Sequence, residues 1–267
     1  MKAKHVRPLR LALGIALLLF WEVFPRVGLV DIVFVPPPSR VVATIVREWR
    51  VSELGYHTLL STERALVGFG LATAIGTVLG LLIAGAWPRL SEAIEPLVEL
   101  FAQANPVVLF HIVLLFFGIG EGAKIFVIAW MCTWPILFSA IGGVRQVDPD
   151  LVRTTRSFGV NGFTLCWKCL LPGAIPSILT GMRLSGGYAF IMLVATEMMG
   201  TSSGLGWFVV QSQESYHAAR IFAGATIITA LALLLDAALK RFEKRLIQWK
   251  PDFDERRVLI EDVAGIG

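Results

Sequence analysis

The sequence predicts an all-α membrane protein with about six transmembrane helices. Of its 267 residues, 55% are hydrophobic and only 16% are charged, whereas soluble domains carry roughly 25% charged residues. The mean hydropathy is +0.70. Apolar stretches of about 20 residues, the length that a helix needs to cross a bilayer, recur along the chain. Because a soluble fold would have to bury all of this apolar surface in one core, we expect a single membrane domain over residues 1–267.

Six segments are candidate spans. The first could instead be the apolar region of a cleaved signal peptide, but Trp21-Glu22-Val23-Phe24 follows it where a cleavage site would need small residues. We therefore predict a retained span. The six predicted spans are 9–24, 65–87 with a start near Thr58, 93–117, 123–141, 175–199 and 221–239.

A polar segment, 25–56, separates the first two predicted spans. Pro36-Pro37-Pro38 cannot continue a helix, and Ser39 is then a plausible N-cap for a new one. The apolar residues that follow recur on one helical face, which predicts a helix lying in the membrane interface. The alternative is a solvent-exposed connecting helix. The face comprises Val41, Val42, Ile45, Val46 and Trp49.

Both ends of the chain are basic, and basic flanks tend to remain in the cytoplasm. An even number of spans with both ends inside is self-consistent, so the segment 25–56 is predicted to be external and the tail 240–267 cytoplasmic. Binding of nucleic acid by these ends is not expected, because no aromatic residues are interleaved with the charges. The basic residues are Lys2, Lys4, Arg7 and Arg10 at the N-terminus and Lys240, Arg241, Lys244, Arg245 and Lys250 at the C-terminus.

The loop 145–172, cytoplasmic in this topology, is too polar to span a membrane and too long for a tight turn. Asp148 or Asp150 can cap a short helix that runs to about Phe158, and Gly159 permits the positive φ that ends such a helix. A second short helix is expected over 162–170, stopped by Pro172 before the next span. Two short helices on one face of a bundle would form a docking surface.

This loop resembles the coupling loop of binding-protein-dependent ABC importer permeases. The family pattern is Glu-Ala-Ala, three residues, Gly, nine residues, Ile, one residue and Leu-Pro, and Gly159, Leu171 and Pro172 occupy the matching positions. The resemblance extends from about Ser39 to Glu243 and is greatest to the nitrate, sulfonate and taurine branch. Flanking matches include Leu66–Phe69, Phe117–Glu121, Asp148-Pro149, Pro176–Leu184, Val194–Met198 and Gly204–Gly206.

One departure concerns charge. Arg153-Thr154-Thr155 stands where the family has Glu-Ala-Ala, and Cys169 replaces the usual Ile. Either the partner presents a compensating acid, or Arg153 faces solvent. The predicted coupling site comprises Arg153, Thr154, Thr155, Phe158, Gly159, Leu171 and Pro172.

The resemblance implies a type I ABC importer permease fold in a bacterial inner membrane and a separate ABC ATPase dimer that binds ATP and Mg. It also implies a periplasmic or lipid-anchored binding protein and a second copy of this chain. The chain itself is not expected to be an enzyme or to bind a cofactor. Its nearest approach to a phosphate-binding loop, at 118–124, has the wrong spacing and lacks the following Ser or Thr. Cys166 and Cys169 lack the second pair of ligands that zinc needs, so no metal site is expected.

Polar residues inside spans are the candidates for the translocation pathway or its gate, because ionisable groups are costly in a bilayer. We select Asn105 and His111 in the third predicted span and Glu197, with the adjacent Met198, late in the fifth. For each of them a structural hydrogen bond between helices is the competing interpretation.

The substrate expected from the resemblance is a small organic or inorganic anion such as nitrate, sulfonate or taurine. The alternative function is a secondary transporter or channel with no ATPase partner. Such transporters often show repeated halves and broken helices, and the sequence shows no clear internal repeat.

Overall fold

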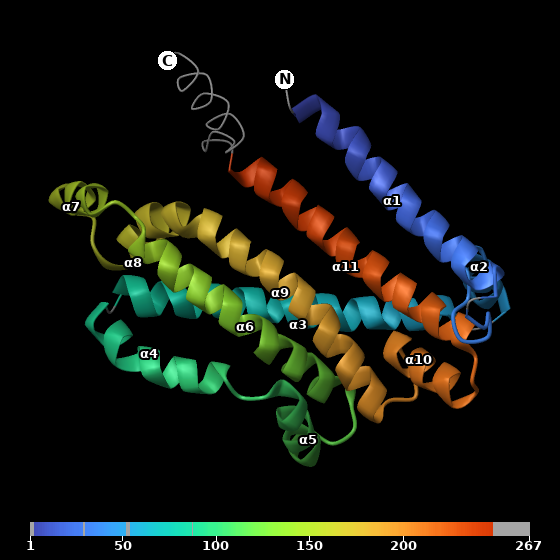
Figure 1. Cartoon of the computed structure of the whole chain (residues 1–267). Helices are drawn as coiled ribbons and strands as arrows, with labels where there is room; N and C mark the ends of the chain where they lie inside the picture. The colour runs from blue at the N-terminus through green and yellow to red at the C-terminus, as the bar shows by residue number, and fades with distance from the viewer. Residues whose placement is uncertain (1–2, 29, 52–53, 87, 248–267) are drawn as a thin grey trace. The chain divides into compact units, whose positions relative to one another are not determined.

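The computed structural model describes residues 3–28, 30–51, 54–86 and 88–247. The regular elements in these ranges are all helices (Figure 1), which confirms the predicted fold class. They are α1 (Ala3–Arg26), α2 (Pro38–Val51), α3 (Leu54–Leu81), η1 (Leu82–Ala86), α4 (Pro88–Ala102), α5 (Pro106–Phe117), α6 (Glu121–Arg145), α7 (Pro149–Ser157), α8 (Gly162–Leu165), η2 (Cys166–Leu170), α9 (Leu171–Gly200), α10 (Leu205–Glu214) and α11 (Ala218–Leu246), where η1 and η2 are π-helical turns.

The helices divide into two compact units. As far as the structure describes them, unit 1 comprises Met1–Gly70, Asn105–Met131 and Tyr188–Leu233, and unit 2 comprises Leu71–Ala104, Cys132–Gly187 and Leu234–Gly267. Both units are therefore assembled from segments that lie far apart in the sequence.

Four helical segments in the described part are long and apolar enough to cross a membrane, and the broken pair 96–102 and 106–117 would make a fifth. The four are Leu54–Gly85, Glu121–Arg145, Gly162–Met199 and Ala218–Leu246. They contain or overlap four of the predicted spans, although Trp87 lies outside the described residues. The predicted span 9–24 falls within α1, which is not among these four segments. The side chains of residues 3–11, the first nine of α1, lie outside the described part of the chain.

The prediction of one continuous third span over 93–117 is wrong. Helix α4 ends at Ala102, and Asn105 then caps a new helix, α5. The Asn105 side-chain oxygen accepts hydrogen bonds from the backbone N–H groups of Val107 (3.0 Å) and Val108 (3.4 Å). Pro106 follows at the first helical position, where its missing N–H costs nothing. Local capping thus overrides the continuous hydrophobicity of this segment.

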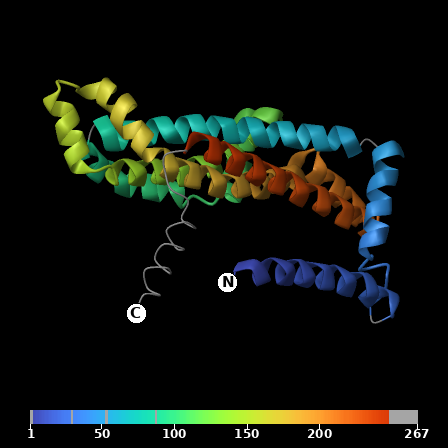
Figure 2. The same cartoon turned by 90° about the horizontal axis from the view of Figure 1, so that it is seen from above.

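In unit 1, α2 runs from the end of α1 to the beginning of α3 (Figure 2). The prediction that Ser39 is the N-cap of α2 is wrong, because the helix already includes Pro38. The Glu22 carboxylate of α1 takes that role. It accepts the Ser39 backbone N–H at 3.0 Å and the Ser39 hydroxyl at 2.7 Å, and it also pairs with Arg26.

The predicted apolar face of α2 is divided between packing and exposure. Val41 is buried, whereas Val42, Val46 and Trp49 are at least half exposed. Exposed apolar side chains of this kind are compatible with a helix in the membrane interface, which remains a prediction.

In unit 2, small residues bring three helices into close contact. A Cβ added at Gly76 of α3 would lie 2.9 Å from the Thr133 carbonyl oxygen and 3.0 Å from Ile136 Cβ in α6. A Cβ at Gly143 of α6 would similarly lie 3.0 Å from the Ala174 carbonyl oxygen in α9. Gly80, four residues after Gly76, is equally close to α6, because a Cβ there would lie 2.5 Å from Ala140 Cβ, so this pair of glycines lets the two helices approach.

Pro172 does not stop the second loop helix, contrary to the prediction. Helix α8 continues through the π-turn η2 into α9, and Pro172 is the second residue of α9. In an ordinary α-helix the proline ring would clash with the carbonyl group four residues earlier. In η2 the Leu171 N–H instead bonds the Cys166 carbonyl oxygen five residues back, and this wider turn accommodates the proline.

Candidate functional site

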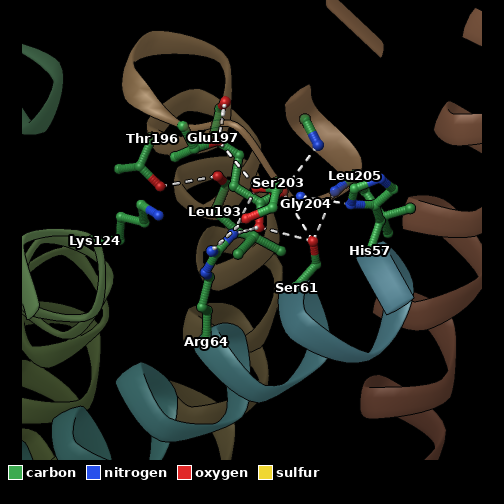
Figure 3. Close-up of polar contacts among 12 residues, drawn as sticks. His57, Ser61, Arg64, Lys124, Leu193, Thr196, Glu197, Ser203, Gly204 and Leu205 are labelled. Atoms are coloured by element: carbon green, nitrogen blue, oxygen red, sulfur yellow. Dashed lines mark hydrogen bonds and ion pairs between the residues drawn. The ribbon is translucent and has the colours of Figure 1, made fainter. Parts of the chain in front are cut away.

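Unit 1 contains a buried network of charged side chains centred on Arg64 of α3 (Figure 3). Arg64 is only 1% exposed. Its Nε and Nη2 atoms donate to the two carboxylate oxygens of Glu121, at 2.5 and 2.6 Å. Its Nη1 atom donates to Glu197 at 2.7 Å and to the Ser203 carbonyl oxygen at 3.0 Å. One guanidinium group thereby links α3 to the start of α6, to α9 and to the segment that leads into α10.

Glu197 of α9 is the buried acid of this network and is 1% exposed. Besides Arg64, it accepts hydrogen bonds from the Ser61 hydroxyl at 2.7 Å and from the Gly206 backbone N–H at 2.9 Å. The Ser61 oxygen in turn accepts the Leu205 N–H at 2.8 Å. These partners provide the compensation that a buried charge requires.

Two glycines allow the backbone to close over this carboxylate. Gly204 has φ = 118°, and a Cβ there would overlap the carboxylate group of Glu197. A Cβ at Gly206 would lie 2.6 Å from Glu197 Cβ. The Gly204 N–H donates to His57 Nδ1 at 3.1 Å, so this nitrogen is unprotonated and the ring is a hydrogen-bond acceptor here.

Glu121 is the open side of the network, because its side chain is 52% exposed. Lys124, 5% exposed, donates to it at 2.9 Å. The two cations and two carboxylates balance, and the three donor nitrogens of Arg64 are all occupied. The arrangement therefore acts as a brace between helices rather than as a site with spare capacity for a ligand.

The predicted pathway residues occupy different environments. Glu197 belongs to the network, and the adjacent Met198 is 43% exposed. The Asn105 side chain is occupied in capping α5. His111 is exposed, with its Nδ1 atom 2.9 Å from the Val107 carbonyl oxygen. The structure does not bring Asn105 or His111 into the network, and their roles in transport remain predictions.

Sequence reasoning missed most of this network. It selected Glu197 because an ionisable residue inside a span is costly. The same rule, applied to the start of the second predicted span, would have selected its partner Arg64. The residues missed are His57, Ser61, Arg64, Glu121 and Lys124. In the sequence, Glu121 and Lys124 stand out only in a rejected phosphate-binding loop and, for Glu121, in a segment that matches the family.

In unit 2, the loop predicted to couple to an ATPase forms a projecting helix, α7, which contains no buried residue. The Asp148 side chain caps it by accepting the Asp150 N–H at 2.8 Å. After the cap residue Phe158, Gly159 adopts φ = 78°, as predicted for the end of this helix. Arg153 pairs with Asp150 at 3.1 Å, but the side chains of both are at least 80% exposed.

The same loop exposes large aromatic side chains. Phe158, Phe163 and Trp167 are 82%, 78% and 60% exposed. The rings of Phe163 and Trp167 are stacked, with centroids 6.1 Å apart. Phe163 and Trp167 line a cavity of about 580 Å³, whose wall also includes Arg156 and the end of α3. Exposed aromatic side chains in an otherwise polar loop are typical of surfaces that bind a partner.

The sequence places this geometry in a known family. Residues 76–248 match the family described as binding-protein-dependent transport system inner membrane component. The chain belongs to this family. It is a transport permease subunit of the ABC importer class, in the nitrate, sulfonate and taurine branch.

Curated relatives match the permease over most of its length. It is 30% identical to a protein named as an aliphatic sulfonates transport permease of Bacillus subtilis, over 91% of this chain and 88% of the relative. It is 29% identical to the taurine transport system permease protein of Escherichia coli, over 87% and 86%. It is 28% identical to the bicarbonate transport system permease protein of Synechocystis, over 85% and 84%.

A solved structure supports the fold. The permease matches a chain of the inward-facing MetNI methionine ABC transporter with a TM-score of 0.65 and 18% sequence identity, over 75% of the permease and 99% of that chain. The predicted type I ABC importer permease fold is thereby confirmed.

Proposed function

We propose that this permease carries a small solute with an oxyanion group, such as a sulfonate, taurine, nitrate or bicarbonate, and that a separate ABC ATPase drives it. A soluble binding protein would deliver the solute. The relatives named for sulfonates, taurine and bicarbonate support this class, because all three solutes carry a small oxyanion group.

The observation that carries the ATPase coupling is the projecting helix α7 with its exposed aromatic neighbours. A helix with no buried residue contributes little to the stability of its own chain. Phe158 at its end leaves 82% of a large apolar surface exposed. Burying that surface in a groove of another subunit would be favourable, and a short rigid helix can transmit movement across a subunit boundary.

Arg153 sets the charge of this contact. Its side chain is 80% exposed and its pairing with the equally open Asp150 is weak at such exposure. An acidic residue in the ATPase groove would complement it.

Two copies of the permease would enclose the translocation pathway on their symmetry axis, with both ends of each chain on the cytoplasmic side.

Replacing Phe158 with alanine is expected to weaken ATPase binding roughly 30-fold, the effect of losing a buried aromatic anchor at an interface. The permease is coexpressed with its ATPase, and the amount that copurifies is measured together with ATP-driven uptake in proteoliposomes. Arg153→Glu is expected to reduce binding as well, and an acid-to-lysine change in the ATPase groove to restore it.

Ser157→Ala is the matched control, because it changes an exposed residue of the same helix without removing an apolar anchor. If Phe158→Ala and Arg153→Glu copurify with the ATPase like the control, α7 is not the coupling element. Uptake that proceeds without any ATPase would favour a secondary transporter or channel instead.

A further inference from the structure

A second polar site in unit 1 shares no lining residue with the Arg64 network. A pocket of about 380 Å³ opens between the α1–α2 region and the turn that joins α10 to α11. Its polar lining side chains are three arginines, a histidine, a threonine and a tyrosine. The side chains that matter here are Arg40, Thr44, Arg47, Tyr216, His217 and Arg220.

The pocket has an excess of positive charge. Glu48, 8% exposed, does not line the pocket but pairs with two of the arginines that do, Arg47 at 3.1 Å and Arg220 at 3.4 Å. Among the described residues, no carboxylate pairs with Arg40. Three arginines therefore line the pocket, while one carboxylate pairs with them among the described residues, which leaves an excess of positive charge.

Arg220 is held in place but not fully satisfied. Its guanidinium lies 4.8 Å from the centre of the Phe208 ring, and Glu48 holds its Nη2 atom. Its Nε atom is buried and has no hydrogen-bond acceptor among the described residues. A buried donor without an acceptor costs roughly 1–3 kcal/mol. The contact with Glu48 is long at 3.4 Å, so the guanidinium retains capacity to bind an anionic oxygen through the part that lines the pocket.

The backbone at the pocket favours an anion as well. Helix α11 begins at Ala218, and both Ala218 and Ala219 line the pocket. The first N–H groups of a helix lack partners within the helix, and the helix dipole places partial positive charge there. This terminus adds to the three arginines and would not define a site alone.

Tyr216 is unusual for its position. It follows the cap residue of α10 and has φ = 56°. The Tyr216 N–H bonds the Gln213 carbonyl oxygen, and the His217 N–H bonds the Ser212 carbonyl oxygen, the pattern of a Schellman motif. Glycine normally occupies this position, because in any other residue this conformation brings the Cβ atom too close to the following carbonyl oxygen. Yet the Tyr216 side chain is 89% exposed, so packing does not explain it.

We propose that this pocket binds an oxyanion, with Arg40 and Arg220 as its main partners and Tyr216 as a further hydroxyl donor. The occupant is either a free small anion or the phosphate of a lipid headgroup, which present the same chemistry to the arginines. This site goes beyond the proposed function and does not depend on an ATPase partner.

Binding of radiolabelled sulfate to the purified full-length permease in nanodiscs of phosphatidylcholine tests the proposal. Arg40→Gln is expected to weaken sulfate binding about tenfold, the usual effect of losing a charged hydrogen-bond partner. Arg50→Gln is the matched control. It removes one exposed arginine from the same helix outside the pocket and is expected to leave binding unchanged.

The source of the anion is distinguished with phosphatidylglycerol. If a lipid headgroup is the occupant, phosphatidylglycerol displaces sulfate, and native mass spectrometry shows it retained by the wild type but lost from Arg40→Gln. If a free anion is the occupant, sulfate binding persists in the presence of phosphatidylglycerol. The proposal is overturned if neither probe binds the wild type, or if Arg40→Gln and Arg50→Gln behave alike. It is also overturned if Arg40→Gln alters only the association with an acidic protein.

Discussion

Replacing Arg64 with methionine is expected to lower the stability of the permease by about 3–5 kcal/mol, the cost of breaking a buried ion pair by removing one partner. Methionine retains an unbranched, flexible side chain but no charge. Glu197, 1% exposed, would then keep its charge without the guanidinium that lies 2.7 Å away. A large fall in the melting temperature of the detergent-solubilised protein is the expected measurement.

Changing Glu197 as well gives a sharper test. Glu197→Gln retains an oxygen for the Ser61 hydroxyl and the Gly206 N–H but removes the unbalanced charge. The double variant should therefore melt at a higher temperature than Arg64→Met alone, the non-additive effect expected of two residues in one ion-pair network. Arg50→Met, at an exposed position of α2, is the control and should melt like the wild type. A normal melting temperature for Arg64→Met would show that the network is not structural.

Replacing Gly76 with leucine is expected to destabilise unit 2 by roughly 3 kcal/mol, at the upper end of overpacking effects. Even a single Cβ would lie 2.9 Å from the Thr133 carbonyl oxygen, and this backbone atom cannot move without α6 moving too. The result should be a lower yield of monodisperse protein and a lower melting temperature.

Gly70→Leu is the matched control on the same helix. Gly70 is exposed, and a Cβ there would meet no atom within 4 Å. Removing a glycine from a helix interior is favourable by about 0.5–1 kcal/mol where there is space, so this variant should be as stable as the wild type or slightly more so. Equal loss of stability in both variants would indicate a general effect of leucine rather than a close helix contact.

Local patterns predicted much of the helical structure. Asp148 begins α7 and Gly159 follows its end, as the sequence predicts, because capping and a positive φ depend on neighbouring residues alone. The failures arose where one local signal competed with another or where a distant residue intervened. Asn105 ended a hydrophobic run by capping a new helix, and Glu22 took the capping role predicted for Ser39, 17 residues away.

The candidate site was predicted only in part. Glu197 was selected because a carboxylate inside a span needs a partner, but the identity of that partner is not a local property. Arg64 lies 133 residues away in the sequence, and Glu121 lies on a third helix. The ten residues that line the electropositive pocket come likewise from two distant segments, 32–47 and 216–220.

By itself, the sequence determined that this protein is a helical membrane permease and where its projecting loop lies. Composition, the length of apolar runs and the spacing from Gly159 to Leu171-Pro172 are properties of the chain that need no folding to be seen. Only the tertiary structure decided which charges neutralise one another and which remain open. Arg64 and Arg40 are both arginines near apolar segments, yet folding pairs Arg64 with two carboxylates, whereas no carboxylate in the described part of the chain pairs with Arg40. The free energy of a charge depends on the groups within a few ångströms of it, and packing brings those groups together.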